Sequence, residues 1–455
     1  MAKRRHRRTA LKSDPVEIAI ESMSNEGRGV SHINGKVVFV EGALPKEIVK
    51  AAYQTNRSQY AELRTTEVIT QSPDRVEPPC TYAGACGGCT LQHLNNDSQL
   101  TFKEGVLLEQ LEHVAGLQAR DFVVLPKLRA KVLGYRRKAR LAVRHVVKKG
   151  GVLVGFREKN SGFIMDMQSC QVLHHEVSAL INPLRLMLTS LDASSDIPQI
   201  EVAVGDSEAD GAEGKFIALV FRHLNDLSDK DLEVILDFGL TNAVQIYLQP
   251  EGVDSVKKIF PKDSVPRLYY SLPGHSLNIG FHPLDFTQIN GEMNVMIIDR
   301  VIEILDLQKN DSVLDLFCGL GNFTLPIAKK VRRVTGIEAS AEMVKRAREN
   351  ALNNNISNAE FNVEDLYKAP LSGSWATDHH TKVMLDPPRT GASEVIPLLT
   401  RLKPEKIVYV SCNPVTLARD ANILVSNGFK LKSAGVMDMF PHTSHVESIA
   451  EFAPK

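Results

Sequence analysis

The chain has 455 residues, of which 43% are hydrophobic and 24% charged, as is typical of a soluble protein with more than one domain. Its formal net charge is zero at pH 7, which excludes a protein that is basic throughout but allows local basic patches. No apolar run reaches the roughly 18 residues of a membrane span, and the basic N-terminus lacks the apolar stretch of a secretory signal, so we expect a cytoplasmic protein.

The N-terminal part divides into a basic arm and a β-rich segment. Residues 1–12, with Lys-Arg-Arg-His-Arg-Arg at 3–8, predict a disordered arm. Residues 13–73 contain glycine-punctuated runs that predict the strands of a small barrel, namely Val16–Ile20, Lys36–Val40, Ile48–Tyr53 and Glu62–Ile69. Such a barrel after a basic arm favours RNA binding, although a barrel that contacts another protein has the same pattern.

Four cysteines form a candidate metal site. Cys80, Cys86 and Cys89 follow a proline-rich linker in a C-x5-C-x2-C pattern, and Cys170 lies far beyond them. Four thiolates can hold either zinc or a [4Fe–4S] cluster. Zinc ribbons usually offer two close pairs, so the three-plus-one arrangement favours the iron–sulfur cluster.

The central part, residues 74–285, mixes helical and strand patterns and predicts an α+β domain. Apolar strands are expected at Leu141–Val147, Glu201–Val204 and Phe216–Phe221. Residues 127–159 carry twelve Lys or Arg against one acid, Glu158. A basic block of this kind in a neutral chain favours a polyanionic partner.

Residues 286–455 alternate between short apolar strands and helical stretches such as Ala341–Asn353. This alternation predicts an α/β fold with a doubly wound, Rossmann-like parallel sheet. The expected strands are Val313–Phe317, Val334–Glu338, Val383–Asp386 and Ile407–Val410.

The first of these strands begins a candidate nucleotide site. It ends in a turn that contains Gly319 and Gly321, where the backbone can approach a ligand closely. Glu338 ends the next strand, where an acid can accept hydrogen bonds from both ribose hydroxyls of an adenosine. Asp365, after the third strand, is placed to meet the adenine amino group, and an ordinary loop acid would fit there equally well. With neither a Walker lysine nor a third glycine, the pattern favours an adenosine cofactor without phosphates, S-adenosylmethionine.

Two further strands end in reactive residues. Asp386 is followed by Pro387 and Pro388, which stiffen the loop, and its carboxylate could accept hydrogen bonds from a planar ring. Cys412 ends the next strand within a polar turn, which favours a nucleophile over a buried packing residue. For Cys318, packing is the expected role.

These motifs resemble the RNA uracil-C5 methyltransferase family. The resemblance rests on Asp315-x-Phe-x-Gly-x-Gly, Asp386-Pro-Pro-Arg, Ser411-Cys-Asn-Pro and Phe440-Pro-x-Thr-x-His-Val-Glu447. It implies that Cys412 attacks C6 of a uracil and that Glu447 removes the C5 proton. Together with Gly319 of the turn, it implies a cofactor-binding set of Gln288, Phe317, Asn322, Glu338, Asp365 and Asp386.

Residues 13–73 resemble the TRAM domain, an OB-like RNA-binding module. Within the family, this domain and four such cysteines point to the branch that methylates uridine 1939 of 23S ribosomal RNA, which implies a [4Fe–4S] cluster at Cys80, Cys86, Cys89 and Cys170. We expect a monomer with no membrane partner. Alternatives are another ribosomal or transfer RNA uridine, an adenine-N6 or cytosine-C5 enzyme, and a non-catalytic RNA-binding assembly factor.

Overall fold

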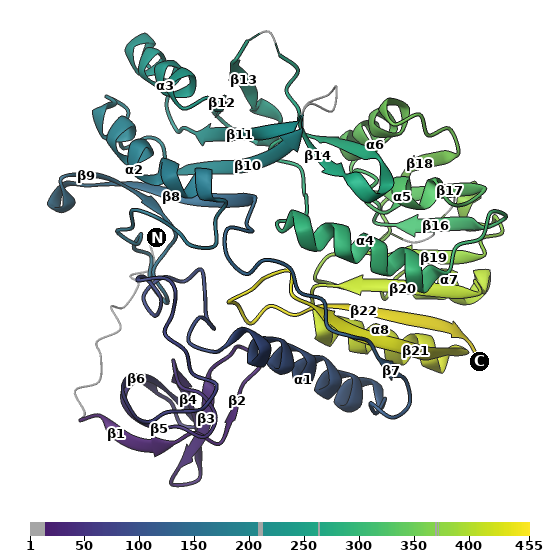
Figure 1. Ribbon diagram of the computed structural model, residues 1–455, viewed down its shortest axis with the longest axis horizontal. Coiled ribbons are helices and arrows are strands. Elements are labelled where there is room, and N and C mark those ends of the chain that lie inside the picture. The colour runs from purple at the N-terminus through teal and green to yellow at the C-terminus, as the bar shows by residue number, and fades with distance from the viewer. Residues whose placement is uncertain (1–13, 208–212, 263, 369–370, 372) are drawn as a thin grey trace. The chain divides into compact units, whose positions relative to one another are not determined.

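The computed structural model describes residues 14–207, 213–262, 264–368, 371 and 373–455 (Figure 1). The predicted basic arm, residues 1–12, lies outside the described residues. The chain forms two compact units: residues up to 102 with 441–445, and residues 103–440 with 446–455. Of the helices in the described parts of the chain, none is long and apolar enough to cross a membrane.

The first unit contains a six-stranded sheet with the strand order β1-β5-β6-β4-β3-β2. Alternate side chains along the strands, such as Val38, Val40 and Leu63, are buried in a common core. The four predicted strands are confirmed as β1, β4, β5 and β6. The bounds are β1 (Val16–Ala19), β2 (Ser22–Met23), β3 (Gly29–Ile33), β4 (Lys36–Glu41), β5 (Ile48–Asn56) and β6 (Tyr60–Thr70).

The second unit starts within helix α1 (Asn96–Ala115) and contains two eight-stranded sheets. The first sheet has the order β13-β12-β11-β10-β14-β15, with β8 added to β10 and β9 added to β8. Its elements are β8 (Lys138–Val146), η1 (Val147–Lys149), β9 (Gly151–Gly155), α2 (His175–Ser190), β10 (Gln199–Ser207), β11 (Glu213–Arg222), α3 (Asp229–Thr241), β12 (Gln245–Gln249), η2 (Val253–Ser255), β13 (Lys257–Phe260), β14 (Leu268–Leu272), η3 (Pro273–His275) and β15 (Leu277–Phe281). The three strands predicted for this region are confirmed as β8, β10 and β11.

The second sheet has the order β18-β17-β16-β19-β20-β22-β21-β7. The strands from β18 to β20 are parallel, as predicted, whereas β22 runs antiparallel to both of its neighbours. The elements are β7 (Val123–Val124), α4 (Gly291–Leu305), β16 (Ser312–Leu316), α5 (Thr324–Ala328), β17 (Arg333–Glu338), α6 (Ala341–Asn353), β18 (Ala359–Val363), η4 (Ser374–Ala376), β19 (Lys382–Leu385), α7 (Ile396–Leu402), β20 (Lys406–Ser411), α8 (Pro414–Ser426), β21 (Phe429–Met437) and β22 (Glu447–Pro454).

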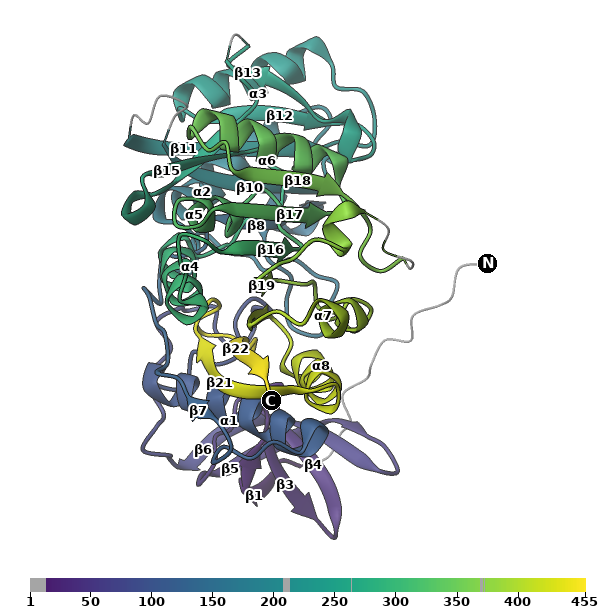
Figure 2. The ribbon, with the colours of Figure 1, turned by 90° about the vertical axis from the view of Figure 1, so that its right-hand side faces the viewer.

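Helices cover both faces of this second sheet, which confirms the doubly wound, Rossmann-like fold. Helix α4 lies on one side of the strands, and α7 and α8 lie on the other (Figure 2). Every residue of β16 and of β19 is buried, as expected of strands in the middle of a covered parallel sheet. Asn290, Ser340 and Asn413 cap helices α4, α6 and α8, because each side chain accepts a hydrogen bond from a backbone N–H of the first turn.

Gly336 of β17 lies where the sheet leaves no room for a side chain. A Cβ at this position would come within 2.8 Å of Cys318 Sγ and 2.9 Å of Phe361 Cδ1. The buried Cys318 thus packs over the middle of β17, in agreement with the packing role expected for it.

We therefore expect Gly336→Ala to destabilise the second unit by about 1–3 kcal/mol, because an extra methyl group in a packed core forces its neighbours to shift. The measurement is the midpoint of thermal unfolding, with Gly252→Ala as the control, since a Cβ at 252 would meet nothing within 4 Å. Equal midpoints for the two variants would show that the side chains around Gly336 can shift to accept a methyl group without loss of stability.

Candidate functional site

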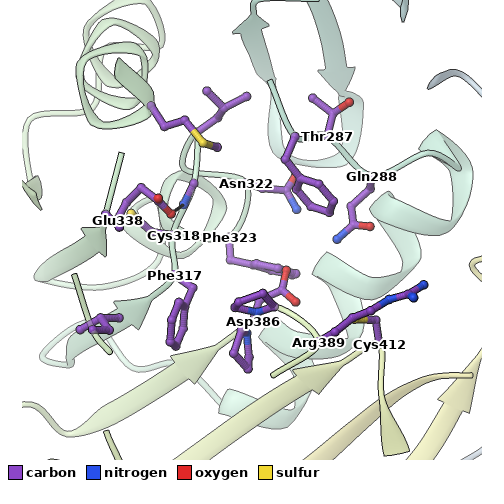
Figure 3. Close-up of a pocket in the computed structure, with 18 of the residues that line it drawn as sticks. Thr287, Gln288, Phe317, Cys318, Asn322, Phe323, Glu338, Asp386, Arg389 and Cys412 are labelled. Atoms are coloured by element: carbon purple, nitrogen blue, oxygen red, sulfur yellow. Dashed lines mark hydrogen bonds between the residues drawn. The ribbon is translucent and has the colours of Figure 1, made fainter. Parts of the chain in front are cut away.

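One cavity of about 520 Å³ lies at the carboxyl ends of the parallel strands in the second sheet. Figure 3 shows Phe317, Cys318 and Glu338 on one side of it, Gln288, Arg389 and Cys412 on the other, and Asp386 between them. This edge of a doubly wound sheet is where such folds bind ligands. The cavity-lining residues include every predicted cofactor and catalytic position, namely Gln288, Phe317, Gly319, Asn322, Glu338, Asp365, Asp386, Cys412 and Glu447.

The turn after β16 holds Glu338 in a fixed orientation. Phe317, Gly319 and Gly321 all have positive φ angles, of 65°, 55° and 87°, so the backbone curls tightly at this point. The Gly319 N–H donates to Glu338 Oε2 over 3.3 Å, and the Ser340 N–H donates to Glu338 Oε1 over 2.9 Å. Each carboxylate oxygen keeps a second lone pair, so Glu338 can still accept two hydroxyl groups from a ligand.

Asn322 belongs to a hydrogen-bonded set of side chains at the base of helix α4. Its amide exchanges two hydrogen bonds of 2.9 Å with the amide of Asn294, and its Oδ1 also accepts the Tyr270 hydroxyl at 2.9 Å. In these contacts Oδ1 of Asn322 is the acceptor and Nδ2 is the donor. Burial raises the pKa of Tyr270 far above its usual value, so the phenol remains a donor at every physiological pH.

Two aromatic rings and an acid also line the cavity. The rings of Phe317 and Tyr367 lie 5.8 Å apart, centroid to centroid. Asp365 accepts the Tyr367 N–H at 3.1 Å and pairs with Lys368 at 3.0 Å, and the Lys368 hydrogen bond lowers the pKa of Asp365. Asp365 is therefore ionised at neutral pH, and a flat ring between these residues would meet both an aromatic face and a hydrogen-bond acceptor.

The loop after β19 is tied to the turn after β20. Asn413, besides capping α8, donates its amide N–H to the backbone oxygen of Arg389 at 3.0 Å. Pro414 occupies the first turn of α8, where its missing N–H costs no hydrogen bond. The Ser-Cys-Asn-Pro and Asp-Pro-Pro-Arg motifs therefore form one structural unit, which presents Asp386, Arg389 and Cys412 to the same cavity.

Strand pairing brings Cys412 and Glu447 to the same end of the sheet. Ser411, the last residue of β20, pairs with Ser448 of β22 in the antiparallel register. Cys412 therefore directly follows the paired end of β20, and Glu447 is the residue before Ser448 at the start of β22. Both side chains line the cavity, and Glu447 raises the pKa of Cys412, so a thiol and a carboxyl group from distant parts of the sequence share one site.

The acidic groups at this end of the cavity compete for protons. Burial raises the pKa of Asp386 to about 7, and it raises the pKa of Glu447 well above its usual range, with Asp386 adding to the effect. Burial, Glu447 and Asp386 together raise the pKa of Cys412 to about 11, against the opposing effect of Arg389. Because the three groups interact, a proton released by the thiol can be taken up by a neighbouring carboxylate.

The structure places the four cysteines of the candidate metal site in different surroundings. Cys80, Cys86 and Cys89 are half-buried in a segment of turns in the first unit, where the Ala83 and Cys86 N–H groups donate to the backbone oxygens of Cys80 and Tyr82. Cys170 is buried in the second unit. Within the described ranges, no three His, Cys, Asp or Glu side chains are arranged to hold a metal ion, so the structure does not support the cluster prediction.

Part of the positive charge of the basic stretch at 127–159 is neutralised by acids elsewhere in the second unit. Several of its cations are engaged by acids within the second unit, through the pairs Lys127–Glu104, Arg137–Asp206, Arg140–Glu201 and Lys149–Asp166. Burial lowers the pKa of Lys138 to about 8. Lys131 and Arg137 line a second, more polar cavity of about 860 Å³, and Tyr270 contributes to both cavities.

Several residues of the cavity were not predicted from the sequence. Tyr270, Phe286, Met343, Tyr367 and Phe440 all line it. Phe440 belongs to the Phe-Pro-x-Thr motif, and Tyr367 follows Asp365 closely, so both carried a local signal. Tyr270 lies on β14, and nothing in its surrounding sequence distinguishes it from an ordinary strand residue.

Comparison with known proteins agrees with this geometry. Residues 257–451 match the model of the tRNA (Uracil-5-)-methyltransferase family, and residues 14–62 match the TRAM domain. The "23S rRNA (uracil(1939)-C(5))-methyltransferase RlmD" of Hahella chejuensis is 47% identical over 451 residues, which cover 98% of this chain and 99% of the relative. The protein of the same name from Alcanivorax borkumensis is 45% identical over 446 residues and 98% of each chain.

A solved structure shows the same fold. The Pyrococcus abyssi tRNA (uracil-54, C5)-methyltransferase in complex with S-adenosyl-L-homocysteine superimposes with a TM-score of 0.71, at 24% identity over 96% of this chain and 100% of that one. The fold class is thereby confirmed, including the Rossmann-like sheet and the N-terminal TRAM domain. With sequence identities of 45–47% along almost its whole length, this chain belongs to the RNA uracil-C5 methyltransferase family of S-adenosylmethionine-dependent enzymes.

Proposed function

We propose that this protein methylates C5 of uridine 1939 in 23S ribosomal RNA, in the cytoplasm, through a transient covalent bond between Cys412 and C6 of the uracil. The observation that carries the proposal is that Cys412 and Glu447, at the adjoining ends of the paired strands β20 and β22, line one cavity with Glu338. The names and high coverage of the relatives support the choice of RNA and of position.

The chemistry accounts for the residue types. Uracil C5 is a weak nucleophile until a thiolate adds to C6, which places negative charge on C5 and O4. S-adenosylmethionine supplies an electrophilic methyl group when bound. After C5 has formed its new bond to carbon, the proton on C5 must pass to a base before the bond between Cys412 Sγ and C6 can break. Glu447, the carboxylate that lines the same cavity as the thiol, is the base in this proposal.

The raised pKa values fit this order of events. A thiol whose pKa is about 11 is protonated at neutral pH, so Cys412 must give up its proton as it attacks. In this proposal Asp386 accepts that proton, which leaves Glu447 free to take the later proton from C5. Arg389 is the cation that favours both the thiolate and the ionised form of Glu447. Burial removes water from the site, which strengthens these electrostatic effects and limits loss of the activated pyrimidine to side reactions.

We also propose that Glu338 binds the ribose hydroxyls of the cofactor, that Asp365 and Phe317 bind its adenine, and that Gln288, Gly319, Asn322 and Asp386 complete the binding set. The lone pairs left on the Glu338 carboxylate and the neighbouring aromatic rings support this assignment.

The domain boundaries at 73 and 285 remain predictions. RNA binding is assigned to the TRAM domain, with added contacts from the basic stretch at 127–159.

The iron–sulfur cluster is a separate proposal. Its support is the sequence pattern, in which three cysteines lie within ten residues of one turn-rich segment, together with the family resemblance. No catalytic step depends on it.

The catalytic pair can be tested with two substitutions that should block different steps of the reaction. Cys412→Ala should abolish methylation, since no nucleophile remains. Glu447→Gln should slow turnover by roughly 10²- to 10⁴-fold. It should also accumulate a methylated protein–RNA adduct, visible as a shifted band on a denaturing gel. The matched control is Glu451→Gln on the same strand, because Glu451 does not line the cavity. Absence of any adduct with Glu447→Gln would assign the base elsewhere.

Cofactor binding can be tested at Glu338. Loss of charge-assisted hydrogen bonds in Glu338→Ala should weaken S-adenosylmethionine binding roughly 10- to 100-fold, measured by isothermal titration calorimetry. Glu342→Gln is the control, since Glu342 is mostly exposed on α6 and pairs with Arg346. An unchanged dissociation constant for Glu338→Ala would contradict the assigned ribose site.

The metal proposal can be tested by chemical analysis. Protein purified without oxygen should be brown and contain iron and acid-labile sulfide in equal amounts, and Cys86→Ser should lose both. Colourless protein that contains zinc in place of iron would contradict the iron–sulfur assignment.

A further inference from the structure

One lysine of the second unit is fully buried next to the end of the strand that pairs with the proposed base. Lys103, on α1, has a fully buried side chain, with no exposed surface. A buried ammonium group is costly unless it is paired and hydrogen-bonded. Its presence here therefore calls for an explanation beyond the packing of a helix.

Lys103 is held by the end of strand β21 and the residues that follow. Its Nζ lies 2.6 Å from Asp438 Oδ1 and donates to the backbone oxygen of Phe440 at 3.0 Å. Asp438 directly follows β21, whose last residue, Met437, pairs with Glu447. Phe440 lines the same cavity as Glu447. The lysine thus fixes the backbone beside the catalytic carboxyl group.

Lys103 also acts on Glu447 electrostatically. The charged groups that act on Glu447 are Asp386, which raises its pKa, and Arg389 and Lys103, which lower it. In turn, burial lowers the pKa of Lys103, while Asp438 and Glu447 favour its charged form and Arg129 opposes it. Arg389 lines the cavity with Cys412, whereas Lys103 is fully buried and does not line it.

We propose that Lys103 is a positioning residue for the deprotonation step: its buried ammonium group holds the 437–440 backbone in place and keeps the Glu447 carboxyl in the ionised form that accepts the C5 proton. The inference rests on the proposed function, because it requires Glu447 to be the base. The proton moves from C5 to Glu447, while Asp438 and Glu447 favour the charged form of Lys103 against the effect of its burial.

The direction of the pH effect follows from the charges. Glu447 accepts a proton only when it is ionised, so the rate of adduct breakdown falls as the pH drops through the pKa of Glu447. Removing a cation raises that pKa. Lys103→Met should therefore move the acidic limb of the pH–rate profile to higher pH, by about one pH unit. At pH 7, the adduct should then break down about tenfold more slowly, while its formation continues.

The experiment is single-turnover methylation of a 23S RNA fragment that contains uridine 1939, from pH 5.5 to 9, using the full-length chain. Adduct and product are quantified on denaturing gels, and S-adenosylmethionine affinity is measured by calorimetry. Lys103→Met should accumulate adduct at neutral pH with unchanged cofactor affinity. Lys103→Arg keeps the charge and should retain the wild-type limb. Lys230→Met, which loses only an exposed pair with Asp192, is the control.

A double variant separates charge from stability. Lys103→Met alone leaves Asp438 buried without its cation and should lower the thermal midpoint. Lys103→Met with Asp438→Asn removes both charges, so the midpoint should recover. The displaced pH limb should persist, because Asp438 is not among the charged groups that act on Glu447.

The outcomes distinguish this inference from the proposed function. If Glu447→Gln traps the adduct but the pH limb is unmoved in both the single and the double Lys103 variants, Lys103 is merely structural and the base assignment stands. If Glu447→Gln traps no adduct, Glu447 is not the base, and both proposals are wrong.

Discussion

The antiparallel pairing of β20 with β22 is the constraint on which the site depends. A parallel sheet alone brings the carboxyl ends of its strands to one edge, and so it can gather Glu338, Asp386 and Cys412. The antiparallel strand β22 adds a group from another part of the chain, because it begins at the edge where the parallel strands end. Its first residue, Glu447, lines the same cavity as Cys412.

Burial of the site raises the pKa values of its acidic groups, so they ionise less readily than in water. Asp386, Cys412 and Glu447 all have raised pKa values, and burial is the largest cause for each. In such a site, positive charge determines which group is ionised at a given moment. Arg389 lines the cavity, and Lys103 is a buried cation that does not line it, yet both favour the ionised form of Glu447. Our proposals divide the two cations accordingly, with Arg389 supporting both reactive groups and Lys103 supporting the base alone.

Much of the cavity could be predicted from the sequence because its signals are local. Gly319, Glu338, Asp386 and Cys412 each lie at the end of an apolar strand, and strand ends are readable from a few neighbouring residues. The register of β22 could not be predicted in this way, since it depends on which strand β22 joins. The motif around Glu447 supplied its role only through the family resemblance. Likewise, Tyr270 lies on β14 of the other sheet, and only the folded chain brings it to Asn322.

Charge patterns in the sequence do not show which charges the fold pairs with one another. The stretch at 127–159 has one acid among its own residues, yet acids from distant segments, such as Asp206 and Glu201, neutralise part of it. Lys103 shows the opposite case. In the sequence it stands beside Glu104, and two adjacent charged residues are typical of an exposed face. The fold buries it completely and pairs it with Asp438. Local composition describes where a charge can be solvated, whereas its role in catalysis depends on which distant charges share its buried environment.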